Sequence, residues 1–245
     1  MAFHLRAFIG AAAVSLLAAS AANAGPTIDF STIAGGNNTS LGPTSSLGGI
    51  AISAYETNFS TTSNLWLRKE GTSDDGLGVC STGESCPTGG SGGGDVNELS
   101  NEIKIEWIVL QRPTNEKWAE LWVSSLDSGG TGGSETGTLY WSNTLGDLTT
   151  GHFSFTFSDL GGDVNGDILT LLQASGFDPF AKYVMFRAGT DGQGASADYN
   201  NDYLVWGATL TACPDCDTQN VPEPVTMSLF GAGLAGVAIL RRRRK

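Results

Sequence analysis

Two glutamates four residues apart, Glu102 and Glu106, are the first residues whose types and spacing could do chemistry. The segment between them alternates polar and apolar residues, so both carboxyl groups are expected on one face of a strand. Hydrolysis of a glycosidic bond needs two carboxyl groups roughly 5–9 Å apart across a sugar cleft. The alternative is a solvent-exposed strand face carrying Glu, Lys and Glu, and we favour it over catalysis.

A second group of candidates consists of oxygen ligands for calcium. Asp163, Asn165 and Asp167 alternate along the chain like the start of an EF-hand-type loop. The pattern then departs from that loop, because Ile168 stands where a glycine is needed and Ala174 where a glutamate is needed. These residues therefore predict a weak calcium site or an Asp/Asn turn.

Loop carboxylates distant in the sequence could build another calcium site. The candidates are Asp74 or Asp75, Glu98, and Asp198 or Asp202. Calcium is thus the one cofactor that the sequence suggests, and no other cofactor is expected.

Aromatic side chains offer a third chemistry, stacking on sugar rings. Trp118 and Trp122 share one face of an expected strand, and Trp141 lies near a strand end. Tyr140, Tyr199 and Tyr203 are further candidates. The alternative is that these rings fill the core of the domain.

Cysteines occur as two close pairs, Cys80 with Cys86 and Cys213 with Cys216. An exported chain favours disulfides over free thiols, but four cysteines allow three connectivities. Metal or redox chemistry at Cys213 and Cys216 is the weaker alternative. His152, the one histidine between the terminal segments, is expected to be structural, because no Gly-x-Ser-x-Gly motif accompanies it.

Short strands must position these residues. The segment 25–220 is rich in Gly, Ser, Thr and Asn, and its short apolar alternations predict an all-β domain with two antiparallel sheets, a jelly-roll or lectin-like β-sandwich. The expected strands are residues 27–33, 50–55, 64–69, 102–110, 117–124, 137–141, 152–157, 182–188 and 203–211, with a strand or short helix at 168–174. Residues 35–49 and 71–94 are expected to be loops.

The two ends of the chain carry targeting signals. Residues 1–24 read as a signal peptide, with Arg6, an apolar stretch and a cleavage site between Ala24 and Gly25. Residues 221–245 combine Pro222-Glu223-Pro224, an uncharged segment from 225 to 240 and the basic tail 241–245. The prolines end the folded domain, the apolar segment is expected to be a transmembrane helix, and the basic residues keep this end in the cytoplasm.

This C-terminal arrangement closely resembles the PEP-CTERM sorting signal of Gram-negative bacteria. The resemblance implies recognition by exosortase, which cuts near Pro222-Glu223-Pro224, and export by a bacterium that makes exopolysaccharide. Signal peptidase is the other expected processing partner. The expected path is an inner-membrane intermediate, held by the C-terminal helix, and then the outer surface or the extracellular matrix. An ordinary membrane anchor is the alternative.

Two weaker resemblances lie within the domain. Residues 75–80, followed by Asn97-Glu98-Leu99 and the strand from Glu102, look like a pattern of many PEP-CTERM ectodomains, with a Gly-Leu-Gly-Val turn before an acidic strand. The segment Glu102-Ile103-Lys104-Ile105-Glu106 superficially resembles the core of laminarinase-like glucanases, but Lys104 replaces the aspartate that those enzymes need. The resemblance to the ectodomains implies a lectin-type sandwich, and the departure at Lys104 argues against catalysis.

The net charge of the domain limits the classes of partner that it can bind. The whole chain has a net charge of −12, but residues 25–221 contain seven Lys and Arg against 24 Asp and Glu, a net charge of −17. Nucleic acid and anionic membrane surfaces are therefore poor partners. We expect a structural or adhesive protein of a biofilm or exopolysaccharide matrix rather than an enzyme, with a carbohydrate-binding module as the main alternative and a glycan hydrolase as a weaker one.

Overall fold

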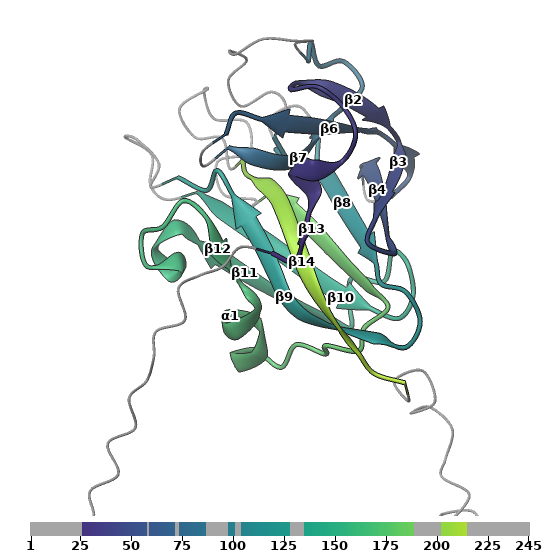
Figure 1. Ribbon diagram of the computed structural model, residues 1–245, viewed down its shortest axis with the longest axis vertical. Coiled ribbons are helices and arrows are strands. Elements are labelled where there is room, and N and C mark those ends of the chain that lie inside the picture. Colours follow the sequence, from purple (N-terminus) through teal and green to yellow (C-terminus); the bar gives the residue numbers. More distant parts are fainter. Residues whose placement is uncertain are drawn as a thin grey trace, which may run out of the picture.

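The computed structural model describes residues 26–57, 59–71, 74–86, 98–100, 104–127, 135–188 and 202–214. These residues form two antiparallel sheets packed face to face (Figure 1), which confirms the predicted all-β sandwich. In spatial order, sheet A is β12-β9-β14-β7-β6-β2, with β1 paired to β14, and sheet B is β11-β10-β13-β8-β4-β3, with β5 paired to β4.

The strands of sheet A are β1 (Ile28–Asp29), β2 (Thr39–Gly42), β6 (Asn64–Lys69), β7 (Asp75–Cys80), β9 (Glu116–Ser124), β12 (Gly166–Asp167) and β14 (Leu204–Ala212). Those of sheet B are β3 (Thr44–Leu47), β4 (Ile50–Glu56), β5 (Thr61–Thr62), β8 (Glu106–Gln111), β10 (Thr136–Ser142), β11 (Gly151–Thr156) and β13 (Tyr183–Ala188). The helical elements are η1 (Phe30–Thr32), η3 (Phe157–Leu160) and α1 (Leu169–Ala174).

The main core lies between the sheets, where alternating apolar residues meet. In β4, Ile50, Ile52 and Ala54 are fully buried, and in β6 Leu65 and Leu67 are fully buried as well. This is the period-two pattern expected of strands with one face on a core. Strands β6 and β8 are covered on their other face as well, because Leu65 to Arg68 and Trp107 to Leu110 are all buried. Both faces of these two strands therefore lie against other side chains.

The predicted strand at residues 27–33 is largely wrong. It stops after Asp29, whose carboxylate accepts a hydrogen bond from the Ser31 amide (2.9 Å) and starts the helical turn η1. A short acidic side chain that binds a nearby backbone amide competes in this way with strand pairing. For residues 168–174 the sequence allowed either a strand or a short helix, and the structure has the helix α1 there.

The predicted loops at residues 35–49 and 71–94 contain strands that the sequence reading missed. Polar β2 and β3 form the outer strands of the two sheets, where no apolar face is required. Strand β7, which the sequence suggested was a Gly-Leu-Gly-Val turn, lies between β14 and β6. Gly76 allows this position, because a Cβ atom there would lie 2.8 Å from the carbonyl oxygen of Val205.

Candidate functional site

Glu106, one member of the predicted carboxylate pair, opens β8 and is 0% exposed. The Ser81 hydroxyl donates a hydrogen bond to its Oε1 (2.6 Å), and the Ser100 amide donates one to its Oε2 (2.8 Å). Burial raises the pKa of Glu106 well above its ordinary value, and the nearby Glu84 raises it further, against the effect of the two hydrogen bonds. The expectation of a solvent-exposed face is therefore wrong for Glu106, and Glu102 lies outside the described residues.

Glu56 lies directly opposite Glu106, in register across β4 and β8. It is 3% exposed, accepts a hydrogen bond from the Thr82 amide (2.8 Å) and forms an ion pair with Lys104 (3.1 Å). Burial raises its pKa, but the Thr82 amide and the Lys104 ammonium outweigh burial and lower its pKa overall. Two carboxyl groups thus bind the segment that follows β7.

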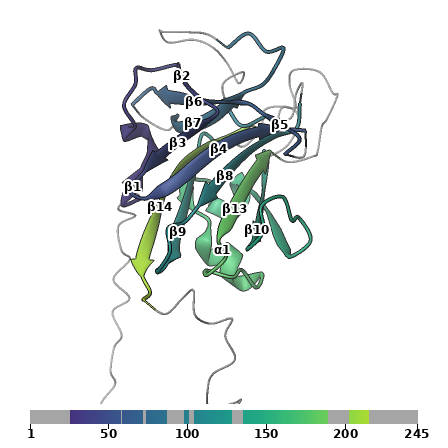
Figure 2. The same cartoon turned by 90° about the vertical axis from the view of Figure 1, so that its right-hand side faces the viewer.

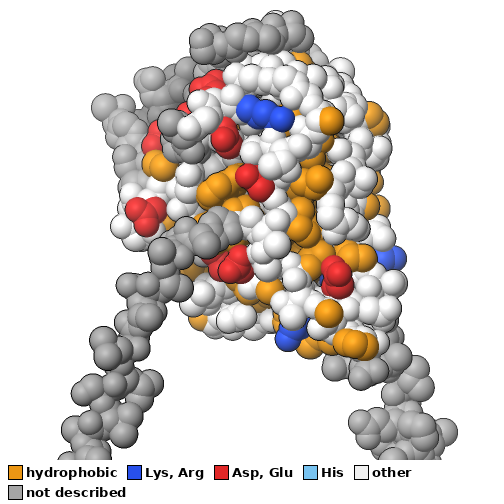
Figure 3. All heavy atoms as spheres, viewed as in Figure 1, with side chains coloured by type: hydrophobic (Ala, Val, Ile, Leu, Met, Phe, Trp, Pro, Cys, Tyr) orange, Lys and Arg blue, Asp and Glu red, His pale blue; other side chains and the backbone are white. Residues whose placement is uncertain are grey.

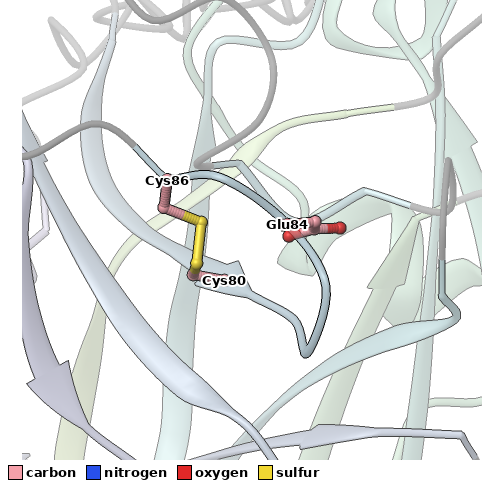
Figure 4. Close-up of side chains that lie close together, drawn as sticks. All are labelled: Cys80, Glu84 and Cys86. Carbon is pink, nitrogen blue, oxygen red and sulfur yellow. A yellow bond between two sulfur atoms is a disulfide. The ribbon is translucent and has the colours of Figure 1, made fainter.

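That segment is closed by a disulfide between Cys80 and Cys86, whose Cα atoms are 6.1 Å apart (Figure 4). This pairing excludes the two connectivities that would join the two cysteine clusters. Cys213 is disulfide-bonded too, and Cys216 lies outside the described residues. Redox or metal chemistry at a free Cys213 thiol is therefore excluded.

Cys80, Glu84 and Cys86 also form the one group of three potential metal ligands found among the described residues. Figure 4 shows both sulfur atoms joined to each other, so neither is a thiolate that could bind a metal. Glu84 accepts a hydrogen bond from the Ser81 amide (2.8 Å). Cys80, Glu84 and Cys86 therefore belong to a disulfide-closed turn that lies over the buried Glu106.

The loop carboxylates predicted as calcium ligands are in contact with other protein groups. Glu98 is ion-paired with Arg68 and accepts a hydrogen bond from the Ser125 hydroxyl (2.9 Å). Asp75 accepts one from the Gly71 amide (2.8 Å), and Asp202 is 4% exposed just before β14. In the structure the partner of Glu98 is therefore Arg68.

The other predicted calcium ligands, Asp163, Asn165 and Asp167, lie in and around β12. Oδ1 of Asp167 accepts hydrogen bonds from the amides of Leu121 (3.0 Å) and Leu169 (2.9 Å), so this residue joins β9 to the start of α1. Burial raises the pKa of Asp167. Asp163 is exposed in the preceding turn, and Asn165 is half-buried. This geometry accounts for Asp167 as a turn residue, and calcium binding stays a prediction.

The three predicted sugar-stacking tryptophans are buried. Trp118 is 1% exposed and its indole N–H donates to the Ala181 carbonyl (2.9 Å). Trp122 and Trp141 are 4% and 5% exposed, and they pack edge to face against Trp206 and Phe177. Trp118 and Trp141 belong to the core between the sheets, as the core alternative expects. Trp122 is buried outside that core, against the half-buried Trp206.

Sequence reasoning named Tyr140 as a stacking candidate but missed the aromatic group around it, on the outer face of sheet B. We call it the outer aromatic face, and its members are Tyr55, Phe59, Trp107, Tyr140, His152 and Tyr183. Ring centroids are 5.5 Å apart between Tyr55 and Phe59, 4.6 Å between Phe59 and Trp107, and 5.4 Å between Trp107 and Tyr140. His152 is stacked on Tyr140 at 5.5 Å.

These rings form one row of contacts from β4 to β11. Trp107 is fully buried beneath its neighbours, His152 is exposed, and the tyrosines are half-buried. The available signal was the continuous apolar run in β8, because a strand that is apolar on both faces needs a cover on each. Sequence alone did not tell which strands lie beside it.

The targeting segments lie outside the described residues. They include Ala24 and Gly25, Pro222, Glu223 and Pro224, and the predicted transmembrane helix at 225–240. Within the described ranges, no helix combines the length and apolar character needed to cross a bilayer.

Comparison with known proteins bears on the C-terminal segment. A family model described as the PEP-CTERM protein-sorting motif matches residues 220–244. No curated protein and no solved structure matches the chain. The motif indicates an exported protein with a membrane-anchored intermediate that exosortase processes.

Proposed function

We propose that this chain, which carries a PEP-CTERM sorting motif, becomes a structural or adhesive protein of the cell surface or the exopolysaccharide matrix. Exosortase would cut at or near Pro222-Glu223-Pro224, after signal peptidase has cut between Ala24 and Gly25. The observation that carries the proposal is the match of the motif at residues 220–244. The final location is the outer surface or the extracellular matrix of a Gram-negative bacterium.

The folded domain suits such a location. The Cys80–Cys86 disulfide is a crosslink that persists in an oxidising compartment. Acidic side chains are spread over the face of the molecule in Figure 3, in keeping with the acidic composition. A high net negative charge keeps a protein soluble and limits binding to other anionic surfaces.

The proposed role is not enzymatic. Glu106 is fully buried, and its two oxygens accept hydrogen bonds from Ser81 and Ser100. A general acid or nucleophile must reach its substrate within hydrogen-bond distance. These contacts therefore support a structural role for Glu106.

The test is the intact mass of the exported protein from a host with exosortase and from the same host without it. A C-terminus near Pro222–Pro224 that depends on exosortase, and an N-terminus at Gly25, would support the proposal. Replacement of Pro222, Glu223 and Pro224 by alanine should leave the full-length, membrane-bound form. The neighbouring pair Thr218→Ala and Gln219→Ala is the matched control and should be processed normally.

A full-length, membrane-bound product in both hosts would make the C-terminal segment a plain anchor and overturn the proposed sorting. Processing without retention at the surface or in the matrix would overturn the proposed location.

Carbohydrate binding is the second candidate function. The outer aromatic face favours it, because several half-buried tyrosine rings and an exposed histidine lie on one sheet face. Rings with an apolar face and a polar edge suit contacts with sugars.

A further inference from the structure

The outer aromatic face extends over neighbouring strands in a regular register. Tyr55 lies opposite Trp107, and Trp107 lies opposite Arg187. In the next row, Met185 lies opposite Tyr140, and Tyr140 lies opposite His152. Figure 2 shows β4, β8, β13 and β10 side by side on this side of the molecule. The rings therefore occupy one surface of four strands and the neighbouring β11.

Two cations belong to this surface. The Arg187 guanidinium lies 5.5 Å from the centroid of the Trp107 ring, and Lys182 Nζ lies 5.1 Å from that of Tyr183. Lys182 is exposed and Arg187 is half-buried. Both cations thus lie beside aromatic rings, which is a favourable arrangement.

Arg187 has no carboxylate within ion-pair distance among the described residues, unlike Arg68 and Lys104. Its Nε atom and the indole nitrogen of Trp107 are buried, and neither has a hydrogen-bond partner within the described ranges. Most buried polar groups in proteins do have such a partner. A half-buried arginine that has no anionic partner in the described part of the chain is a feature expected where a ligand supplies the anion.

The charge of this surface contrasts with that of the domain. The positions of β4, β8, β13, β10 and β11 that share the face of Trp107 include Ser53, Gln111, Thr138, Ser142 and Ser154, and none of these facing positions is Asp or Glu. Asp147 lies at the edge, where it accepts hydrogen bonds from Thr149 and Thr150. A basic surface on a strongly acidic domain is complementary to an anionic ligand.

We propose that the outer aromatic face binds an anionic polysaccharide whose sugars carry carboxylate groups. Tyr55, Tyr140 and Tyr183 provide ring surfaces for the sugars, while Arg187 and Lys182 bind the carboxylates. The half-buried Ser53 and Gln111 and the exposed Ser154 of the same face are available to sugar hydroxyls. The inference rests on the proposed function only in that an exopolysaccharide matrix would supply this ligand.

The experiment is affinity electrophoresis of the full-length chain, purified in detergent, through gels that contain polygalacturonate. Dextran gels provide the neutral comparison. Wild-type protein should be retarded by polygalacturonate more than by dextran, and added salt should weaken the retardation. Tyr140→Ala should lower the affinity roughly tenfold, as expected for the loss of one stacking contact.

Lys182→Gln should lower the affinity for polygalacturonate and reduce its dependence on salt, with the fold retained. Its matched control is Lys117→Gln, because Lys117 also lies near an aromatic ring, 5.9 Å from the centroid of Phe180, but on sheet A. The control should bind like the wild type. If Tyr140→Ala does not fold, the comparison of Lys182→Gln with Lys117→Gln still tests whether the outer aromatic face binds polygalacturonate.

Absence of retardation by polygalacturonate at low salt would overturn the proposal. So would equal retardation in dextran, or equal loss of binding in Lys182→Gln and Lys117→Gln. None of these results depends on exosortase, so they are distinct from a failure of the sorting test.

Discussion

Glu56 and Glu106 lie opposite each other on β4 and β8, and the structure shifts their pKa values in opposite directions. Burial and repulsion from Glu84 raise the pKa of Glu106 well above its ordinary value. Glu56 is 3% exposed, and the Thr82 amide and the Lys104 ammonium favour its ionised form. Both side chains bind the disulfide-closed turn, Glu106 through the Ser81 hydroxyl and Glu56 through the Thr82 amide.

Glu106→Gln should make the domain more stable near neutral pH. Unfolded Glu106 ionises near 4.5, whereas folded Glu106 keeps its proton to higher pH, so the wild type loses stability as the pH rises through that interval. Glutamine cannot ionise, so the stability difference should grow by about 1.4 kcal/mol per pH unit across the interval. Urea unfolding of both proteins over a range of pH measures this difference. Glu116→Gln, on β9, controls for the loss of one charge, and parallel curves for Glu106→Gln and wild type would contradict the prediction.

Glu56→Gln should show the opposite dependence. The lowered pKa of Glu56 contributes stability that is present above about 4.5 and is lost as the pH falls through its folded value. At neutral pH the variant should unfold with a free energy about 1–3 kcal/mol lower, because a hydrogen bond and an ion pair lose their charged acceptor. Thermal unfolding at neutral and at acidic pH gives the comparison. A destabilisation that is equal at both pH values would show that the charge of Glu56 is unimportant.

The double variant Cys80→Ser, Cys86→Ser should be less stable by about 2 kcal/mol, the value expected for a short closed loop. For a domain of this size the melting temperature should fall by about 4–8 °C. Calorimetry without reductant measures the change. The wild type in reductant should approach the variant, and if the two proteins melt together without reductant, the crosslink does not stabilise the fold.

Gly137→Ala should destabilise sheet B at β10 and β11. Gly137 lies opposite Phe155, and a Cβ atom at this glycine would fall 2.2 Å from the Phe155 ring. The fully buried ring cannot move without disturbing the core, so a loss of about 1–3 kcal/mol is expected. Gly36→Ala is the control, because the nearest side-chain atom there is the Thr39 hydroxyl at 3.4 Å. Equal melting temperatures for the two variants would show that the ring adapts.

The sequence predicted the strands whose faces differ in polarity. Strand β6 begins and ends where its alternation does, at Asn64 and Lys69, and β9, β10, β11 and β13 are displaced by at most one residue at each end. In these strands every second side chain enters the core, so the local pattern carries the information. The two-sheet architecture follows from this pattern.

The remaining features depend on contacts between distant residues. Gly76 in β7 read as part of a turn because its role, close approach to the backbone of Val205 in β14, involves a residue more than a hundred positions away. Glu106 read as solvent-exposed because Ser81 and Ser100, which enclose it, come from other segments. The outer aromatic face was missed for the same reason, since its rings come from five strands and one turn.

The pairing of β14 has a mechanical consequence. This last described strand lies between β9 and β7, and it pairs with β9 from Leu204 to Ala212, with register shifts between Val205 and Gly207 and between Thr209 and Leu210. The sorting motif follows β14 in the sequence. A pulling force applied beyond residue 214 would act on β14 along the axis of the strand. The hydrogen bonds to β9 would then be loaded together in shear, instead of opening one after another as in a peeled edge strand. A domain tethered through this end is therefore built to resist tension.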